Sequence, residues 1–215
     1  MSWRRVSVAV LSVVAAGCAG RTTLPEASQT LASPARFDGD FFLRQEIVAR
    51  YVGRSITFKA ALEKRADVLR LVGLTPFGSP AFMIEQSGDE VHFKEYVHLG
   101  IPFDPVNMLV DVHHILFEGS GIGARLGDGI HEFKSAGGSI FETWRDGNIV
   151  SRTFFDTDST TELSRIEFQG ARDPTSITSP LVRLYDRTHS YEIEIKTVEQ
   201  RLLGSAGPRK SAAGN

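Results

Sequence analysis

Hydrophobic and polar residues alternate with a period of two along most of residues 37–203, as is typical of half-buried β-strands. Short turns separate the alternating segments, among them Ser87-Gly88-Asp89 and Asp146-Gly147, and the second of these favours a two-residue hairpin. The pattern predicts ten strands, with a further short strand at 130–133. The ten are residues 41–51, 55–63, 68–74, 80–86, 91–96, 139–145, 148–155, 161–169, 179–185 and 190–198.

Midway along the chain the hydrophobic period changes to that of a helix. Asp104 stands at the N-cap position before Pro105, and Gly119 follows the last apolar residue as a C-terminal stop. Apolar residues occupy two faces of this segment, so the helix is sandwiched or lies inside a concavity. The sequence therefore predicts a mainly β domain: a strongly curved antiparallel sheet, or incomplete β-barrel, of about ten strands wrapped round one inserted α-helix.

The first eighteen residues have a different character. Arg4 and Arg5 precede an apolar run at 6–16, which has the length of a secretory signal and is too short to span a bilayer. Small residues then lead into Cys18, the single cysteine of the chain. This junction resembles the bacterial lipobox, in which the cysteine is acylated and the preceding peptide removed, although Ala15 stands where a larger aliphatic residue is usual. The alternative is an ordinary secretory signal with a cysteine near its cleavage site.

These features divide the chain into four parts. We expect a lipoprotein signal peptide at 1–17, a lipidated Cys18 with a flexible tether to residue 36, the barrel domain at 37–203 and a disordered tail at 204–215. Ala19, not an aspartate, follows the cysteine, which in enterobacteria favours export to the outer membrane. The expected location is the bacterial cell envelope, lipid-anchored on the periplasmic face of the outer membrane.

The charge of the chain limits its possible partners, and its cysteine content limits what can stabilise the domain. The chain has a net charge of −2, and removal of the signal leaves 22 basic against 26 acidic residues. No basic run indicates a nucleic-acid partner, so membrane residence depends on the acyl chains of Cys18. One cysteine excludes an intramolecular disulfide, and the domain must gain its stability from a packed core.

Several residues suggest chemistry, but none forms a convincing site. His113 and His114 are adjacent and diverge by about 100° on a helix, whereas helical metal ligands lie at i and i+4. His113 shares the apolar face and is expected to be structural. Ser120 lies in a glycine-rich stretch without the frame of a nucleophile. Three aspartates in turn-like segments are expected to be solvated: Asp156, Asp158 and Asp173. We therefore expect no catalytic residue, no metal site, no cofactor and no enzymatic activity.

The segment VLRLVGLTPFGSPAFMIEQSGDEVHF, residues 68–93, resembles the strand–loop–strand core of LolB-type outer-membrane lipoproteins. It is similar above all to an uncharacterised LolB-like lipoprotein family often encoded among aryl polyene lipid biosynthesis genes. The segment 101–119 resembles the lid helix of the LolA/LolB superfamily. The resemblance covers roughly residues 37–200. It implies an incomplete barrel with an apolar interior under a helical lid, which carries or receives lipids or lipoproteins and performs no chemistry.

The resemblance also implies functional positions. In LolB the matching loop exposes a leucine that helps to place lipoproteins in the membrane, and here Phe77, between Pro76 and Gly78, takes that position. The alternative is that Phe77 folds back and caps the mouth of the barrel. The implied cargo is a lipid or an acylated protein. The residues expected to line its cavity are Leu43, Ile56, Phe58, Leu69, Leu71, Phe82, Ile84, Phe93, Tyr191 and Ile193, with Leu109, Val112 and Leu116 as the lid.

Alternation leaves one question open. Inward residues are apolar both in a hollow carrier and in a filled core, so the same positions fit either interpretation. The competing function is a structural or scaffold envelope lipoprotein with a filled core that recruits a protein partner, for example through an exposed edge strand.

Overall fold

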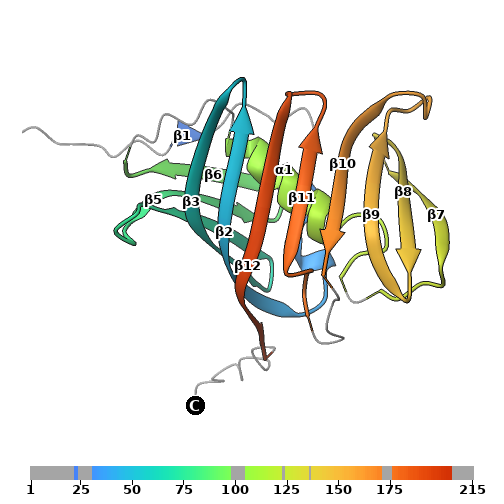
Figure 1. Cartoon of the computed structure of the whole chain (residues 1–215). Helices are drawn as coiled ribbons and strands as arrows, with labels where there is room; N and C mark the ends of the chain where they lie inside the picture. The colour runs from blue at the N-terminus through green and yellow to red at the C-terminus, as the bar shows by residue number, and fades with distance from the viewer. Residues whose placement is uncertain are drawn as a thin grey trace, which may run out of the picture.

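The computed structural model describes residues 22–23, 31–97, 105–122, 124–135, 137–170 and 176–204. These residues form one α-helix, one short 3-10 helix and twelve strands (Figure 1). The elements are β1 (Thr22–Thr23), η1 (Pro34–Arg36), β2 (Asp40–Tyr51), β3 (Arg54–Arg65), β4 (Val68–Leu74), β5 (Pro80–Ser87), β6 (Glu90–Glu95), α1 (Pro105–Leu116), β7 (Gly129–Ser135), β8 (Gly138–Arg145), β9 (Asn148–Phe155), β10 (Glu162–Gln169), β11 (Leu181–Asp186) and β12 (Tyr191–Leu203).

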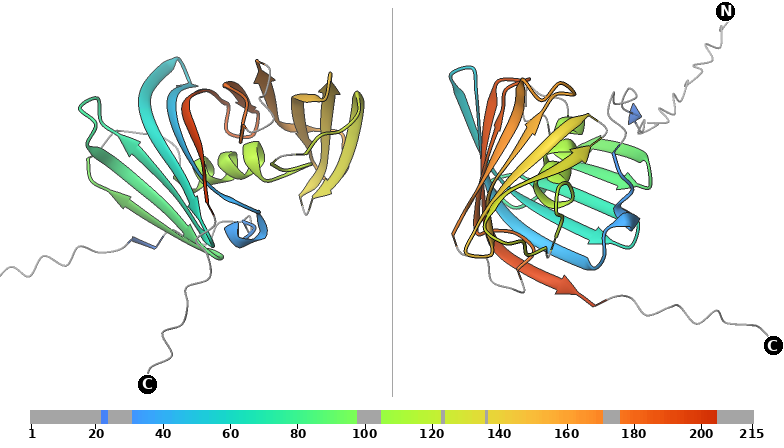
Figure 2. Two further views of the ribbon diagram at one scale, coloured as in Figure 1. Left: turned by 90° about the horizontal axis from the view of Figure 1, so that it is seen from below. Right: turned by 90° about the vertical axis from the view of Figure 1, so that its right-hand side faces the viewer.

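All the strands belong to one antiparallel sheet with the order β1-β6-β5-β4-β3-β2-β12-β11-β10-β9-β8-β7. Two meanders, β2 to β6 and β7 to β12, are joined where β2 pairs with β12 along its whole length. The sheet curls round α1 without closing into a barrel (Figure 2). The predicted fold class is therefore confirmed, with eleven strands of at least six residues and the two-residue β1 in place of about ten.

The inward residues of each strand explain this curvature. In β2 the alternate residues from Phe41 to Ala49 are buried, and in β3 those from Phe58 to Lys64 are buried. Together with the helix they form one hydrophobic core. Because the inward residues of the sheet and the helix share this core, curvature of the sheet towards α1 removes apolar surface from water.

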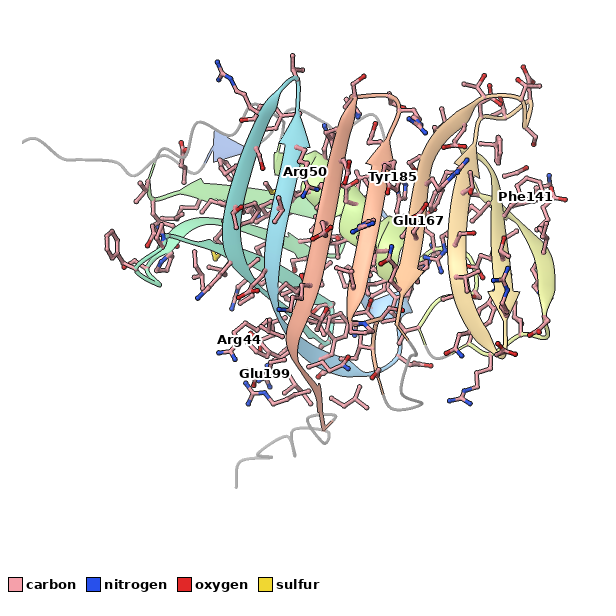
Figure 3. All side chains as sticks on the ribbon, in the orientation of Figure 1. Arg44, Arg50, Phe141, Glu167, Tyr185 and Glu199 are labelled. Carbon is pink, nitrogen blue, oxygen red and sulfur yellow. The ribbon has the colours of Figure 1, made fainter. Side chains whose placement is uncertain are left out.

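The outer, convex face is polar and carries ion pairs between neighbouring strands. Arg50 Nη1 lies 3.0 Å from Glu192 Oε1, and Arg44 Nη2 lies 3.2 Å from Glu199 Oε2. Arg44, Arg50, Glu167 and Glu199 all project from this face in Figure 3. Exposed pairs of this kind contribute little to stability, but they make the outer face hydrophilic.

Several strand boundaries differ from those predicted. The last strand, predicted at 190–198, continues to Leu203 as β12. The short strand expected at 130–133 extends over Gly129–Ser135 as β7. Packed residues also lie N-terminal to residue 37: Leu31 and Pro34 are buried, and Gln86 Nε2 donates a hydrogen bond to the Ala32 carbonyl at 3.0 Å. Cys18, Asp104 and residues 205–215 lie outside the described residues.

Candidate functional site

The helix α1 fills the concave side of the sheet. The predicted interior positions do face it: all are buried except Ile56 and Phe93, which are half-buried and pack against the core. The lid residues Leu109, Val112 and Leu116 are buried as well, with Leu109 fully inaccessible. Sequence alternation therefore identified the correct face at each of these positions.

Among the described residues, the inward side chains of the sheet and the apolar side chains of α1 form one packed hydrophobic core. A cavity at the C-terminal end of α1 has a volume of about 10 Å³ and is lined in part by Ile115, Ser120, Arg152 and Thr178. This volume suits about one water molecule and is far below that of a lipid site. An acyl chain therefore does not fit this cavity while α1 holds its present position.

A buried acid holds the middle of α1. Asp111 is 5% exposed and accepts a 2.8 Å hydrogen bond from the Tyr191 hydroxyl of β12. Burial raises the pKa of Asp111 to about 8, against the opposing effect of the Tyr191 hydrogen bond, and the nearby carboxylate of Asp186 raises it further. At neutral pH this carboxyl group is therefore mostly protonated, and the contact between helix and sheet is a neutral one.

A second polar contact lies two residues further along the helix. His113 Nε2 is 2.8 Å from Gln86 Oε1 of β5, and Gln86 Nε2 in turn donates to the carbonyls of Ala32 and Gly88. Burial lowers the pKa of His113 to about 4, so the ring is neutral at pH 7. Phe117 stacks on Phe37 with ring centroids 3.9 Å apart. His113 is thus a satisfied structural histidine, as predicted.

The C-terminal end of α1 meets a buried ion pair. Arg152 Nη2 of β9 lies 2.7 Å from Glu142 Oε1 of β8, and Arg152 Nη1 donates to the helix carbonyls of His114 and Ile115. Arg152 therefore supplies partners for carbonyl groups that a helix end otherwise leaves unpaired. Burial opposes ionisation of Glu142, but the Arg152 guanidinium and the Ser120 amide together lower its pKa.

Neither this ion pair nor the contact of Asp111 was predicted from the sequence. The signal for the pair was present: an acid and a base occupy inward positions of two strands joined by Asp146-Gly147. Regular pairing outward from that turn, with Arg145 opposite Asn148, places Ser151 opposite Glu142. A register shift between Thr143 and Trp144 instead brings Arg152 opposite Glu142, and a β-bulge of this kind is not readable from the alternation.

The loop between β4 and β5 presents Phe77 to solvent. This side chain is 95% exposed, so the alternative in which it folds back over the mouth is wrong. The loop is closed by hydrogen bonds from the Thr75 amide to the Ser79 carbonyl at 2.8 Å and from the Gly78 amide to the Thr75 carbonyl at 2.9 Å. Gly78 has φ +84, a conformation that glycine adopts without strain. The exposure of Phe77 is therefore built into an ordered turn.

The other candidate groups remain dispersed. His114 stacks on Phe154 of β9 with ring centroids 4.2 Å apart, whereas His113 contacts Gln86 of β5. The two rings therefore contact different strands. Asp156 accepts hydrogen bonds from the amides of Thr160 and Thr161, as expected of a turn acid. Asp173 lies outside the described residues. Within the described ranges, no three acidic, histidine or cysteine side chains are grouped as a metal site.

None of the helices in the described part of the chain has the length and hydropathy needed to cross a membrane.

A family model described as "Protein of unknown function (DUF3261)" matches residues 43–199, more than half of the 215 residues. The chain belongs to the DUF3261 family. The match begins in β2 and ends in β12, so it includes both meanders and α1. No curated protein matches this DUF3261 chain.

Three solved structures resemble this DUF3261 protein at low identity. A domain named for outer-membrane lipoprotein sorting, from Vibrio parahaemolyticus, is 11% identical with a TM-score of 0.45 over 79% of this chain and 88% of that chain. A LolA superfamily protein from Nitrosomonas europaea is 8% identical with a TM-score of 0.44 over 77% and 86%. A DUF1329 family protein from Desulfovibrio piger is 12% identical with a TM-score of 0.41 over 78% and 87%.

Proposed function

We propose that this protein is a lipid-anchored lipoprotein facing the periplasm, which binds an acyl chain between α1 and the concave sheet and receives or transfers lipids or lipoproteins at the outer membrane. The observation that carries the proposal is the position of α1. An apolar helix lies inside an open sheet and takes part in none of its strand pairings. The helix can therefore leave the concavity without breaking a backbone hydrogen bond of the sheet.

Movement of α1 uncovers a surface suited to an acyl chain. The concave residues beneath the helix are aliphatic and aromatic, with Leu43, Leu69 and Ile84 fully inaccessible while α1 is in place. A bound chain replaces the apolar contacts that α1 makes, so the net cost of opening is offset by burial of the ligand. The polar contacts of Asp111, His113 and Arg152 then restore the closed position once the ligand leaves.

Binding of an acyl chain is tested by native mass spectrometry of the full chain after gentle purification, followed by titration with a fluorescent fatty acid. The proposal expects a co-purifying acyl species and saturable binding that the unlabelled fatty acid displaces. A ligand-free protein that also fails to bind the fluorescent fatty acid contradicts it. Labelled palmitate is expected to enter the wild-type chain and not Cys18→Ser, and equal labelling of the two excludes Cys18 as the anchor.

The role of Phe77 has its own test. We expect Phe77→Glu to leave stability within about 0.5 kcal/mol of wild type, since the side chain is exposed, but to reduce delivery of lipid or lipoprotein to acceptor membranes. Val52→Glu is the matched control, because Val52 is 89% exposed at the β2–β3 turn. Undiminished delivery by the Phe77→Glu variant removes this loop from the mechanism.

The filled interior favours a second candidate function. With a cavity of only about 10 Å³ at the end of α1, the domain is also suited to a scaffold lipoprotein that recruits a protein of the envelope. The two functions differ in the fatty-acid titration: the carrier binds saturably, whereas the scaffold binds none at any concentration.

A further inference from the structure

The strand β7 forms one edge of the sheet. It is the last strand in the sheet order, and within the described residues only β8 pairs with it (Figure 1). The opposite edge differs, because β1 pairs with β6 there. The pairing of β7 with β8 runs without a register shift from Gly129 to Ser135, and β7 contains no proline. An edge strand of this length presents unpaired backbone groups to which another strand can bind.

The hydrogen-bonding groups on this edge belong to alternate residues. Ser135 pairs with Gly138 across a two-residue turn, and such closing residues bond to each other. Alternation then directs the backbone groups of the odd-numbered residues towards β8 and those of Ile130, Glu132 and Lys134 outward. The same three residues place their side chains on the convex face. Ile130 is 71% exposed, and the side chains of Glu132 and Lys134 are 45% and 74% exposed.

The charges on the edge are self-complementary. Glu132 and Lys134 are two residues apart and form an ion pair within the strand. In an antiparallel pair of two β7 strands centred on Phe133, Glu132 lies opposite Lys134 of the second copy, and Lys134 lies opposite its Glu132. Both residues have outward backbone groups, so these positions are also the hydrogen-bonded ones. A pair centred on Glu132 instead places two like charges opposite each other, which is unfavourable.

We propose that β7 pairs with β7 of a second copy of this chain about a two-fold axis at Phe133, which joins two sheets into one dimeric sheet. The arrangement is isologous and closed, as most homodimers are. The edge lies at the opposite end of the sheet from the β4–β5 loop, so both copies keep that loop accessible (Figure 1).

Charge reversal tests this pairing. The full chain carrying Cys18→Ser, which cannot be acylated at that position, is followed by sedimentation equilibrium across a wide concentration range. We expect a monomer–dimer equilibrium whose Kd rises on the order of tenfold in Glu132→Lys and in Lys134→Glu, because each reversal sets two like-charged pairs across the interface. The double variant Glu132→Lys/Lys134→Glu restores the pairing and returns the Kd towards the starting value.

Two further variants separate the edge from other causes of association. Arg44→Glu removes an exposed ion pair between β2 and β12, away from the β7 edge, and is expected to leave the Kd unchanged. Glu132→Pro removes an outward N–H without touching the β7–β8 pairing and is expected to give a monomer. Circular dichroism confirms folding of each variant. A monomer at all concentrations, or a dimer whose Kd ignores the single reversals, overturns the proposal.

Discussion

The buried carboxyl group of Asp111 makes the free energy of unfolding fall as the pH rises. We expect the substitution Asp111→Asn to remove this dependence. In the unfolded chain an aspartate ionises near its ordinary pKa of 3.8, whereas in the folded protein burial raises the pKa of Asp111 to about 8. Between these values the folded state holds one proton more than the unfolded state. The free energy of unfolding therefore falls by about 1.4 kcal/mol per pH unit over that window.

The Asp111→Asn variant isolates this effect. The asparagine side chain retains an oxygen that accepts the Tyr191 hydrogen bond, and it does not titrate. His113 and His114 have the opposite effect on the free energy of unfolding. Burial lowers their pKa values to about 4, so stability is lost as the pH falls from 6.5 to 4. Their effect is common to both proteins and cancels in the difference between them. From pH 5 to pH 7 we expect the variant to gain roughly 2–3 kcal/mol relative to wild type.

Urea denaturation followed by tryptophan fluorescence measures this difference. Trp144 is 3% exposed and is the single tryptophan after residue 3, so its emission reports loss of the core. Asp89→Asn, a change at an exposed turn, controls for loss of a surface carboxylate. A stability difference between Asp111→Asn and wild type that stays constant from pH 5 to pH 7 refutes the reasoning, because it means that Asp111 is already ionised in the folded protein.

Two further predictions concern the core. Gly73→Ala is expected to cost about 1–3 kcal/mol in urea denaturation, because a Cβ there lies 2.1 Å from the Phe82 ring; an unchanged urea midpoint contradicts this close approach of the ring to the backbone. Glu142→Gln is expected to cost about 3–5 kcal/mol, because it leaves the Arg152 guanidinium buried without a counter-charge. The double variant Glu142→Gln/Arg152→Met removes the charge and is expected to recover part of that loss, and a double variant no more stable than the single one disproves the charge argument.

Several elements of the fold were predictable because each depends on neighbouring residues. The Asp146-Gly147 hairpin joins β8 and β9 as its turn chemistry requires. The segment after Pro105 is helical, and Gly119, with φ +64, follows its C-terminal turn. The strand β7 was predicted only at 130–133, because it is an edge strand whose residues are exposed or only half-buried and thus lack a strong alternating pattern.

For the candidate site, the sequence predicted only which side of the sheet each residue lies on. Leu43, Phe58 and Ile84 face inward because alternate residues of a strand lie on opposite sides of the sheet. The partners of the polar residues depend on contacts between distant segments. Asp111 and Tyr191 are 80 residues apart, and the opposition of Glu142 and Arg152 depends on a shift in strand register.

The sequence by itself determined the mainly β character of the domain, the single helix and the inward face of each long strand, since all three follow from periodicity along the chain. Tertiary structure alone decided whether the interior is empty, because that depends on how close α1 lies to the sheet. It also decided the exposure of Phe77, through the φ of Gly78 and the hydrogen bonds of its turn. Apolar residues line a filled concavity and a hollow one alike, and only the distance between helix and sheet distinguishes them.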